Sequence, residues 1–138
     1  MTNSFLDEIF EALSNDSDFS SYELLKSYQN THIKYPITHP YVTFGMEEAQ
    51  TDTLILGADD CEIFSENMTV TVAVNENSGI SYCEKVAEDI CTAIIRLDSE
   101  KMITSVSMGK GSYDKSIFGY RIIMKFGLRE TGICFGGE

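Results

Sequence analysis

Apolar residues recur along this chain with two different periods, and the change of period separates helices from strands. Over residues 4–13 they recur at helical intervals, which predicts a short amphipathic helix with Ser4 placed to cap it. A second short helix is predicted over 20–28, where Ser20 and Glu23 form a candidate capping box. The apolar positions of the first helix are Phe5, Leu6, Ile9, Phe10 and Leu13.

The stretch KYPITHPYVTFG, residues 34–45, marks the change from helix to strand. Pro36 and Pro40 remove two amide donors, and each biases the residue before it towards an extended backbone. We therefore expect the helical segment to end before Pro36 and an edge or leading strand to begin at Tyr41.

Alternation with a period of two is clearest over residues 67–75, which predicts a strand with unequal faces. Shorter apolar runs at 41–46 and 52–57 predict two strands before it. In the clear strand the apolar face carries Met68, Val70, Val72 and Val74, and the other face carries Thr69, Thr71 and Ala73.

The main helix is predicted over residues 81–97, with Ser81 and Glu84 as a candidate capping box. It should span about four to five turns and lie on the sheet through one apolar stripe. That stripe consists of Cys83, Val86, Ala87, Ile90, Cys91 and Ile94.

A hairpin is predicted from residues 101–109 and 116–130, joined through 110–115. Alternation favours a strand for its second arm although Arg121, Lys125 and Arg129 recur at intervals of four. Its alternating apolar residues are Tyr120, Ile122, Met124, Phe126 and Leu128. The resulting fold class is α+β, with a mostly antiparallel sheet and helices packed on one face.

At 138 residues the chain fits a single α+β domain, 1–138. We divide it into a helical N-terminal segment (1–33), the sheet with the main helix (34–129) and a loose glycine-rich tail (130–138). The start has no cationic leader, and no apolar run approaches the roughly 20 residues of a membrane span, so a soluble cytoplasmic protein is expected.

The formal net charge of -12 argues against sequence-independent binding of nucleic acid, whose phosphates require cations. The charge is unevenly distributed: residues 1–84 carry a net charge of -13, whereas residues 85–138 carry +1. Either the acids form a solvated surface, or the two halves attract in head-to-tail association. In the second case Arg121, Lys125 and Arg129 form a subunit interface with the acidic half; in the first they are the polar side of a strand.

The four cysteines form no CxxC pair, which favours reduced thiols over disulfides. Cys83 and Cys91 lie eight residues apart on the predicted helix, about 12 Å along its axis, and are interpreted as small buried hydrophobes. His32 and His39 with Cys61 are a zinc candidate, but a proline separates the histidines and no fourth ligand is marked. We interpret both as ordinary loop histidines and expect no metal.

Two other candidates for chemistry have simpler explanations. The acid pairs Glu47-Glu48 and Asp59-Asp60 lack EF-hand spacing and are expected in solvated loops. GKGSYDKS, residues 109–116, has its Gly-Lys order displaced from that of a phosphate loop, and the strand that follows favours a hairpin turn. With no paired catalytic groups and no cofactor motif, we expect no enzyme activity and no cofactor.

From Tyr35 to Arg129 the chain resembles the small tail terminator, or tail-completion, proteins of long-tailed bacteriophages and prophages. After an N-terminal helix, the resemblance is carried in order by YPITHPYVTFGM, MTVTVAV, ISYCEKVAEDICTAI and the hairpin ITSVSMGKGSYDKSIFGYRIIMKFGL. It implies a structural subunit without an active site, made in the bacterial host cytoplasm and found in the tail or neck of the virion. Such subunits assemble as a ring, commonly a hexamer, which ends the tail tube and meets the head-tail connector.

A second hypothesis is a small-molecule-binding or regulatory α+β domain without catalysis. Its only support is the supply of Phe, Tyr and Met that could line an apolar pocket.

Overall fold

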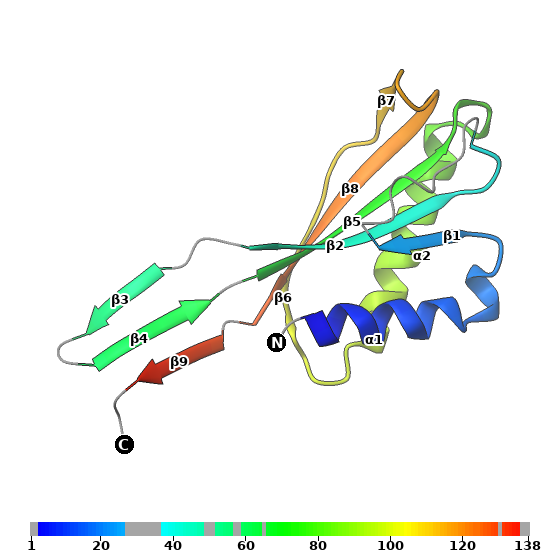
Figure 1. The fold of residues 1–138 in the computed structure, drawn as a ribbon. Helices are drawn as coiled ribbons and strands as arrows, with labels where there is room; N and C mark the ends of the chain where they lie inside the picture. The colour runs from blue at the N-terminus through cyan, green and yellow to red at the C-terminus, as the bar shows by residue number, and fades with distance from the viewer. Residues whose placement is uncertain are drawn as a thin grey trace.

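A six-stranded, mostly antiparallel sheet forms the body of the protein, and both α-helices cover one of its faces (Figure 1). The computed structural model describes residues 3–26, 37–48, 52–56, 59–64, 66–129 and 131–135. The strand order is β1-β2-β5-β8-β6, and β7 also pairs with β8. The strands are β1 (Glu23–Lys26), β2 (Tyr41–Glu48), β5 (Glu66–Asn75), β6 (Ile103–Met108), β7 (Ser112–Asp114) and β8 (Gly119–Leu128). The α+β class with helices on one face is therefore confirmed.

The core lies between the helices and the inner face of the sheet. The apolar face that the sequence predicts for β5 is the buried one, since every even-numbered residue from Met68 to Val74 is buried. On β8 the buried partners in this layer are Ile122, Met124, Phe126 and Leu128. The odd-numbered residues of both strands therefore lie on the outer face, away from the helices.

The two helices pack through the apolar stripes that the sequence predicts. In α1 (Asn3–Ser14), Phe5, Leu6, Ile9 and Leu13 are buried, and in α2 (Ile80–Leu97) the buried residues are Cys83, Val86, Ala87, Ile90, Ala93 and Ile94. The predicted caps are wrong. Ser4 lies inside α1, and Gly79 rather than Ser81 occupies the N-cap position of α2, with a positive φ of 85° that glycine adopts without steric cost.

The second predicted helix, over 20–28, is also wrong in its described part. A short 3-10 helix, η1 (Ser17–Phe19), is capped by Asp16, and the chain then enters β1. β1 pairs in parallel with β2, and the first of their hydrogen bonds runs from Glu23 N to Pro40 O at 2.8 Å. The local sequence suits a helix, but the open edge of β2 offers this segment a ladder of hydrogen bonds.

Strand β2 begins at Tyr41, as the two prolines predict, although residues 27–36 lie outside the described chain. It is a leading strand and not an edge strand, because β1 and β5 flank it.

A second, three-stranded sheet projects from one end of the body, away from both helices (Figure 1). Its order is β3 (Asp52–Leu56), β4 (Asp59–Phe64) and β9 (Thr131–Phe135). The sequence predicted a strand at 52–57 but missed β4, and it predicted a loose tail where β9 forms. β9 pairs with a strand about 70 residues earlier in the chain, and local periodicity carries no information about such a partner.

Candidate assembly surfaces

The outer face of the sheet carries two of the three cations that the sequence singles out. Arg121 and Lys125 are exposed on β8, with the exposed Ile123 between them. They face away from the helix layer and lie about 13 Å apart along the strand. Their neighbours on β5 are short side chains, Ala73 opposite Arg121 and Thr69 opposite Lys125.

Arg129 does not complete a row with the other two cations. It follows the end of β8, where its backbone N–H donates to Met102 O at 2.6 Å. Its guanidinium Nη2 lies 3.4 Å from Met102 Sδ. The structure thus brings Arg121 and Lys125 onto one strand face, whereas Arg129 reaches towards the segment that leads into β6.

Arg121 is paired within its own chain. Its Nη2 lies 3.1 Å from Asp114 Oδ2 on β7. Asp114 Oδ1 accepts hydrogen bonds from the hydroxyl and the backbone N–H of Ser116, at 2.6 and 3.0 Å. The hydrogen bonds from Ser116, followed by the charge of Arg121, lower the pKa of Asp114 below its ordinary value.

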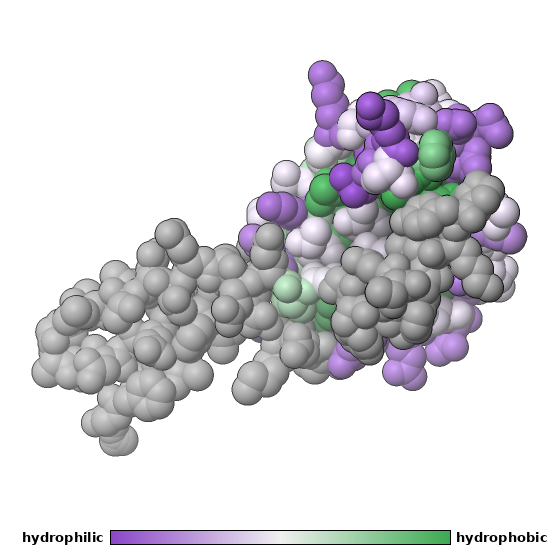
Figure 2. All heavy atoms as spheres, turned by 45° about the horizontal axis from the view of Figure 1, so that its top comes forward, coloured by the Kyte–Doolittle hydropathy of each residue, from purple (hydrophilic) through white to green (hydrophobic). Residues whose placement is uncertain are grey.

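Aromatic contacts and hydrogen bonds fix the rest of this end of the sheet. Tyr113 donates from its hydroxyl to Glu76 Oε1 at 2.7 Å, and this hydrogen bond raises the pKa of Tyr113. Its ring meets that of Tyr120 edge to face, with centroids 5.4 Å apart. In the turn between β7 and β8, Phe118 is exposed. Figure 2, which brings this end of the body forward, shows hydrophobic residues among hydrophilic ones there. Hydrophobic periodicity gave no sign of Phe118, because it lies in a turn.

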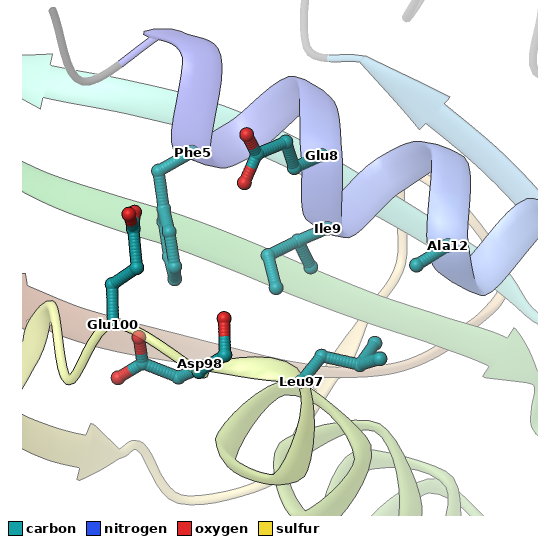
Figure 3. A pocket seen from close by; sticks show the side chains of 8 residues that line it. Phe5, Glu8, Ile9, Ala12, Leu97, Asp98 and Glu100 are labelled. Atoms are coloured by element: carbon teal, nitrogen blue, oxygen red, sulfur yellow. The ribbon is translucent and has the colours of Figure 1, made fainter.

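A pocket of about 170 Å³ lies between α1 and the loop that follows α2 (Figure 3). Asp98, in that loop, is buried, and its two carboxylate oxygens accept from the backbone N–H groups of Met102 and Ile103 at 2.8 and 2.9 Å. The pocket joins segments about 90 residues apart in the chain, so no local pattern announces it. Its lining consists of Phe5, Glu8, Ile9, Ala12, Leu97, Asp98, Ser99 and Glu100.

The zinc candidate gains no support. His39 is exposed, and its Nδ1 lies 3.1 Å from the hydroxyl of its neighbour Thr38. Cys61 belongs to β4 in the projecting sheet, and His32 lies outside the described residues. Within the described ranges no three His, Cys, Asp or Glu residues gather as metal ligands.

Cys83 and Cys91 are free thiols, as their spacing on α2 predicts. Cys83 is buried, and desolvation raises its pKa to about 11. Its Sγ lies 3.6 Å from Tyr120 O, which gives the thiol hydrogen a weak acceptor. Cys91 is half-buried, and desolvation likewise raises its pKa. Both thiols are therefore neutral near pH 7 and make poor nucleophiles.

The remaining candidates resolve into ordinary strand structure. Residues 109–116 run through β7 into the turn before β8, and Gly109 N donates to Ile123 O at 2.8 Å, so this segment is the predicted hairpin connection and not a phosphate loop. The acid pairs expected in loops are wrongly placed: Glu47-Glu48 end β2, and Asp59-Asp60 begin β4.

Among the described residues, no helix is both long and apolar enough to cross a membrane. No protein-family model matches the chain, and no curated protein matches it significantly.

Proposed function

We propose that this chain is a structural, non-catalytic subunit of a phage or prophage virion, a tail terminator-like protein that forms a ring at the end of the tail tube. The observation that carries the proposal is the difference in charge between the acidic helices and the outer face of β8. α1 has three acids and no base, and α2 has three acids against two bases. The outer face of β8, on the other side of the sheet, carries Arg121 and Lys125.

A body with two different, complementary faces suits heterologous association, in which one patch meets another patch on the next copy. A closed set of such contacts is a ring. Arg121 is paired with Asp114 within its own chain. We propose that Lys125, on the same outer face of β8, takes part in the contact with the acidic layer of a neighbour. The acidity of the chain would also let DNA pass through the ring without adhering, because carboxylates and phosphates repel.

The projecting sheet supports the same proposal. In the described residues β3 and β9 are the outer strands of this sheet, and each pairs there with β4 on one side only. Exposed strand edges favour pairing with other chains, and assemblies commonly cover them. We propose that this sheet contacts the tail tube or the connector.

The small-molecule hypothesis receives no specific support from the pocket beside α1. Its volume of about 170 Å³ is below the roughly 300 Å³ at which ligand pockets begin, and acids line part of it.

The test has two measurements. Electron microscopy of the purified protein, alone and mixed with tail tubes of the same phage or prophage, should show rings, and rings on tube ends that stop tube growth. Lys125→Glu should reduce ring formation while leaving the melting temperature close to that of the wild type. Tubes that keep growing and carry no rings in the presence of the protein would refute the proposal.

A further inference from the structure

Phe118 is the most exposed large hydrophobic residue of the described chain, with 58% of its surface accessible. It also has a left-handed backbone, with φ of 51°. That conformation is costly for a bulky residue, and glycine or asparagine would adopt it more readily. Solvent exposure of a phenyl ring and backbone strain thus coincide at one position, where asparagine would reduce both.

The turn that carries Phe118 is rigidly held. Phe118 O accepts from Glu76 N at 3.1 Å, and Phe118 N donates to Lys115 O at 3.4 Å. The ion pair between Arg121 and Asp114 and the hydrogen bonds of Ser116 fix the strands on either side. The ring is therefore presented on a preorganised support, which lowers the entropy lost when it is bound.

The pocket beside α1 matches this ring in size. Its apolar lining is formed by Phe5, Ile9, Ala12 and Leu97, and Figure 3 shows Phe5 and Ile9 pointing from α1 towards the loop after α2. Its volume is about 170 Å³, and an apolar cavity of about 150 Å³ is large enough to bind benzene.

The charges around the two features are complementary. Both oxygens of Asp98 are used by backbone N–H groups, which leaves Glu8 and Glu100 as the acids of the pocket. Within the described residues the carboxylate of neither acid makes a hydrogen bond or an ion pair. Lys115, three residues before Phe118, is exposed in the turn. A phenyl ring seated in the pocket would bring this cation towards two unpaired carboxylates.

The ring and the pocket lie at opposite ends of the body. The turn between β7 and β8 is at the top of Figure 1, and the pocket lies at the bottom, between the start of α1 and the loop after α2. One chain cannot fill its own pocket with its own turn, so Phe118 can reach this pocket only in a second copy.

We propose that Phe118 of one copy inserts into the α1 pocket of the next copy, with Lys115 lying beside Glu8 and Glu100. The contact is heterologous, so it repeats around a ring. The inference rests on the ring of the proposed function, and it names the contact that joins neighbouring copies.

The test measures self-association without any tail tube, by sedimentation equilibrium across the soluble concentration range. Phe118→Gly should weaken association at least about tenfold, as loss of a buried aromatic anchor does, and should not lower the melting temperature because glycine relieves the strained turn. Ile95→Gln is the matched control, since it removes an exposed apolar side chain on α2 that is 50% accessible. It should leave association unchanged.

A second variant acts on the pocket. Ala12→Leu fills it from a helical position without changing any charge, and it should weaken association as Phe118→Gly does. Mixing the two variants is decisive. The Ala12→Leu chain keeps Phe118 and the Phe118→Gly chain keeps an open pocket, so each mixed pair can form one such contact. We expect heterodimers and no larger species.

The outcomes separate the inference from the proposed function. A wild-type chain that stays monomeric overturns the inference, as does association that Phe118→Gly and Ala12→Leu leave intact. If both variants still associate and their oligomeric rings still cap tail tubes, the inference is wrong but the proposed function is supported. Association that depends on Phe118 and Ala12, from a protein that never caps tubes, would support the inference and refute the proposed function.

Discussion

The guanidinium of Arg121 lies 3.1 Å from the carboxylate of Asp114, and this ion pair joins β8 to β7 at the end of the sheet that carries Phe118. The pairing changes the role that the sequence predicts for Arg121. The cation holds a turn of its own chain in place.

Replacing Asp114 should remove a pH-dependent part of the stability. Hydrogen bonds from Ser116, together with Arg121, lower the pKa of Asp114, so its contribution is complete above the ordinary Asp pKa of about 3.9 and is lost as pH falls through the lower folded value. Thermal melts of the wild type and Asp114→Asn should differ most near neutral pH and converge in acid. Ser116→Ala is the control, because it keeps the carboxylate but should raise the pKa of Asp114 in an NMR titration. A difference independent of pH would contradict the assignment.

The buried stripe of α2 gives a direct test of the packing. Ile90 is fully buried, and Ile90→Ala should lower the free energy of unfolding by about 2 to 5 kcal/mol through lost burial and a residual cavity. Ile95→Ala makes the same chemical change at a position that is 50% accessible, and its effect should stay within about 0.5 kcal/mol. Urea denaturation measures both. Equal effects would mean that another face of α2 lies on the sheet.

Local periodicity predicted the parts of the fold whose buried face repeats within one element. The stripe of α2 and the alternation of β5 and β8 are of this kind, and the bounds of each element were predicted within three residues. The prediction failed for β1, because YELLK suits a helix by itself and only pairing with the edge of β2 makes it a strand. The prediction also failed for β9, because the strand with which it pairs lies about 70 residues away in the chain.

The candidate sites were less predictable than the fold for the same reason. Arg121 and Lys125 share a strand face, which alternation predicts, but the pairing of Arg121 depends on where β7 places Asp114. The pocket forms only because α1 and the loop after α2 lie side by side in the fold, and local sequence patterns do not predict that contact. The exposure of Phe118 depends on the positive φ of its turn, and no hydrophobic pattern encodes that angle.

Asp98 should matter for stability out of proportion to its place in a loop. It accepts two backbone N–H groups, from Met102 and Ile103, and so fixes the connection between α2 and β6. Asp98→Ala leaves both donors without this acceptor and should cost about 1 to 3 kcal/mol in a urea titration. Asp98→Asn retains one oxygen acceptor and should cost less. If the alanine variant is as stable as the wild type, water replaces the carboxylate and the loop does not depend on it.

The projecting sheet offers a test of its register. Cys61 on β4 and Cys134 on β9 are Cα partners in the antiparallel ladder. Directly opposed residues in such ladders have Cα atoms about 4.5 to 5.5 Å apart, which lies within the range that a disulfide spans. A mild oxidant should therefore cross-link this pair within one chain, although the cysteine spacing in the sequence favoured reduced thiols. Mass spectrometry of non-reduced peptides identifies the link, and Cys134→Ser should abolish it. Cys83 and Cys91 serve as the internal control, because their positions on α2 are too far apart to join. Failure of Cys61 and Cys134 to cross-link in the folded protein would show that β9 pairs with β4 in a different register.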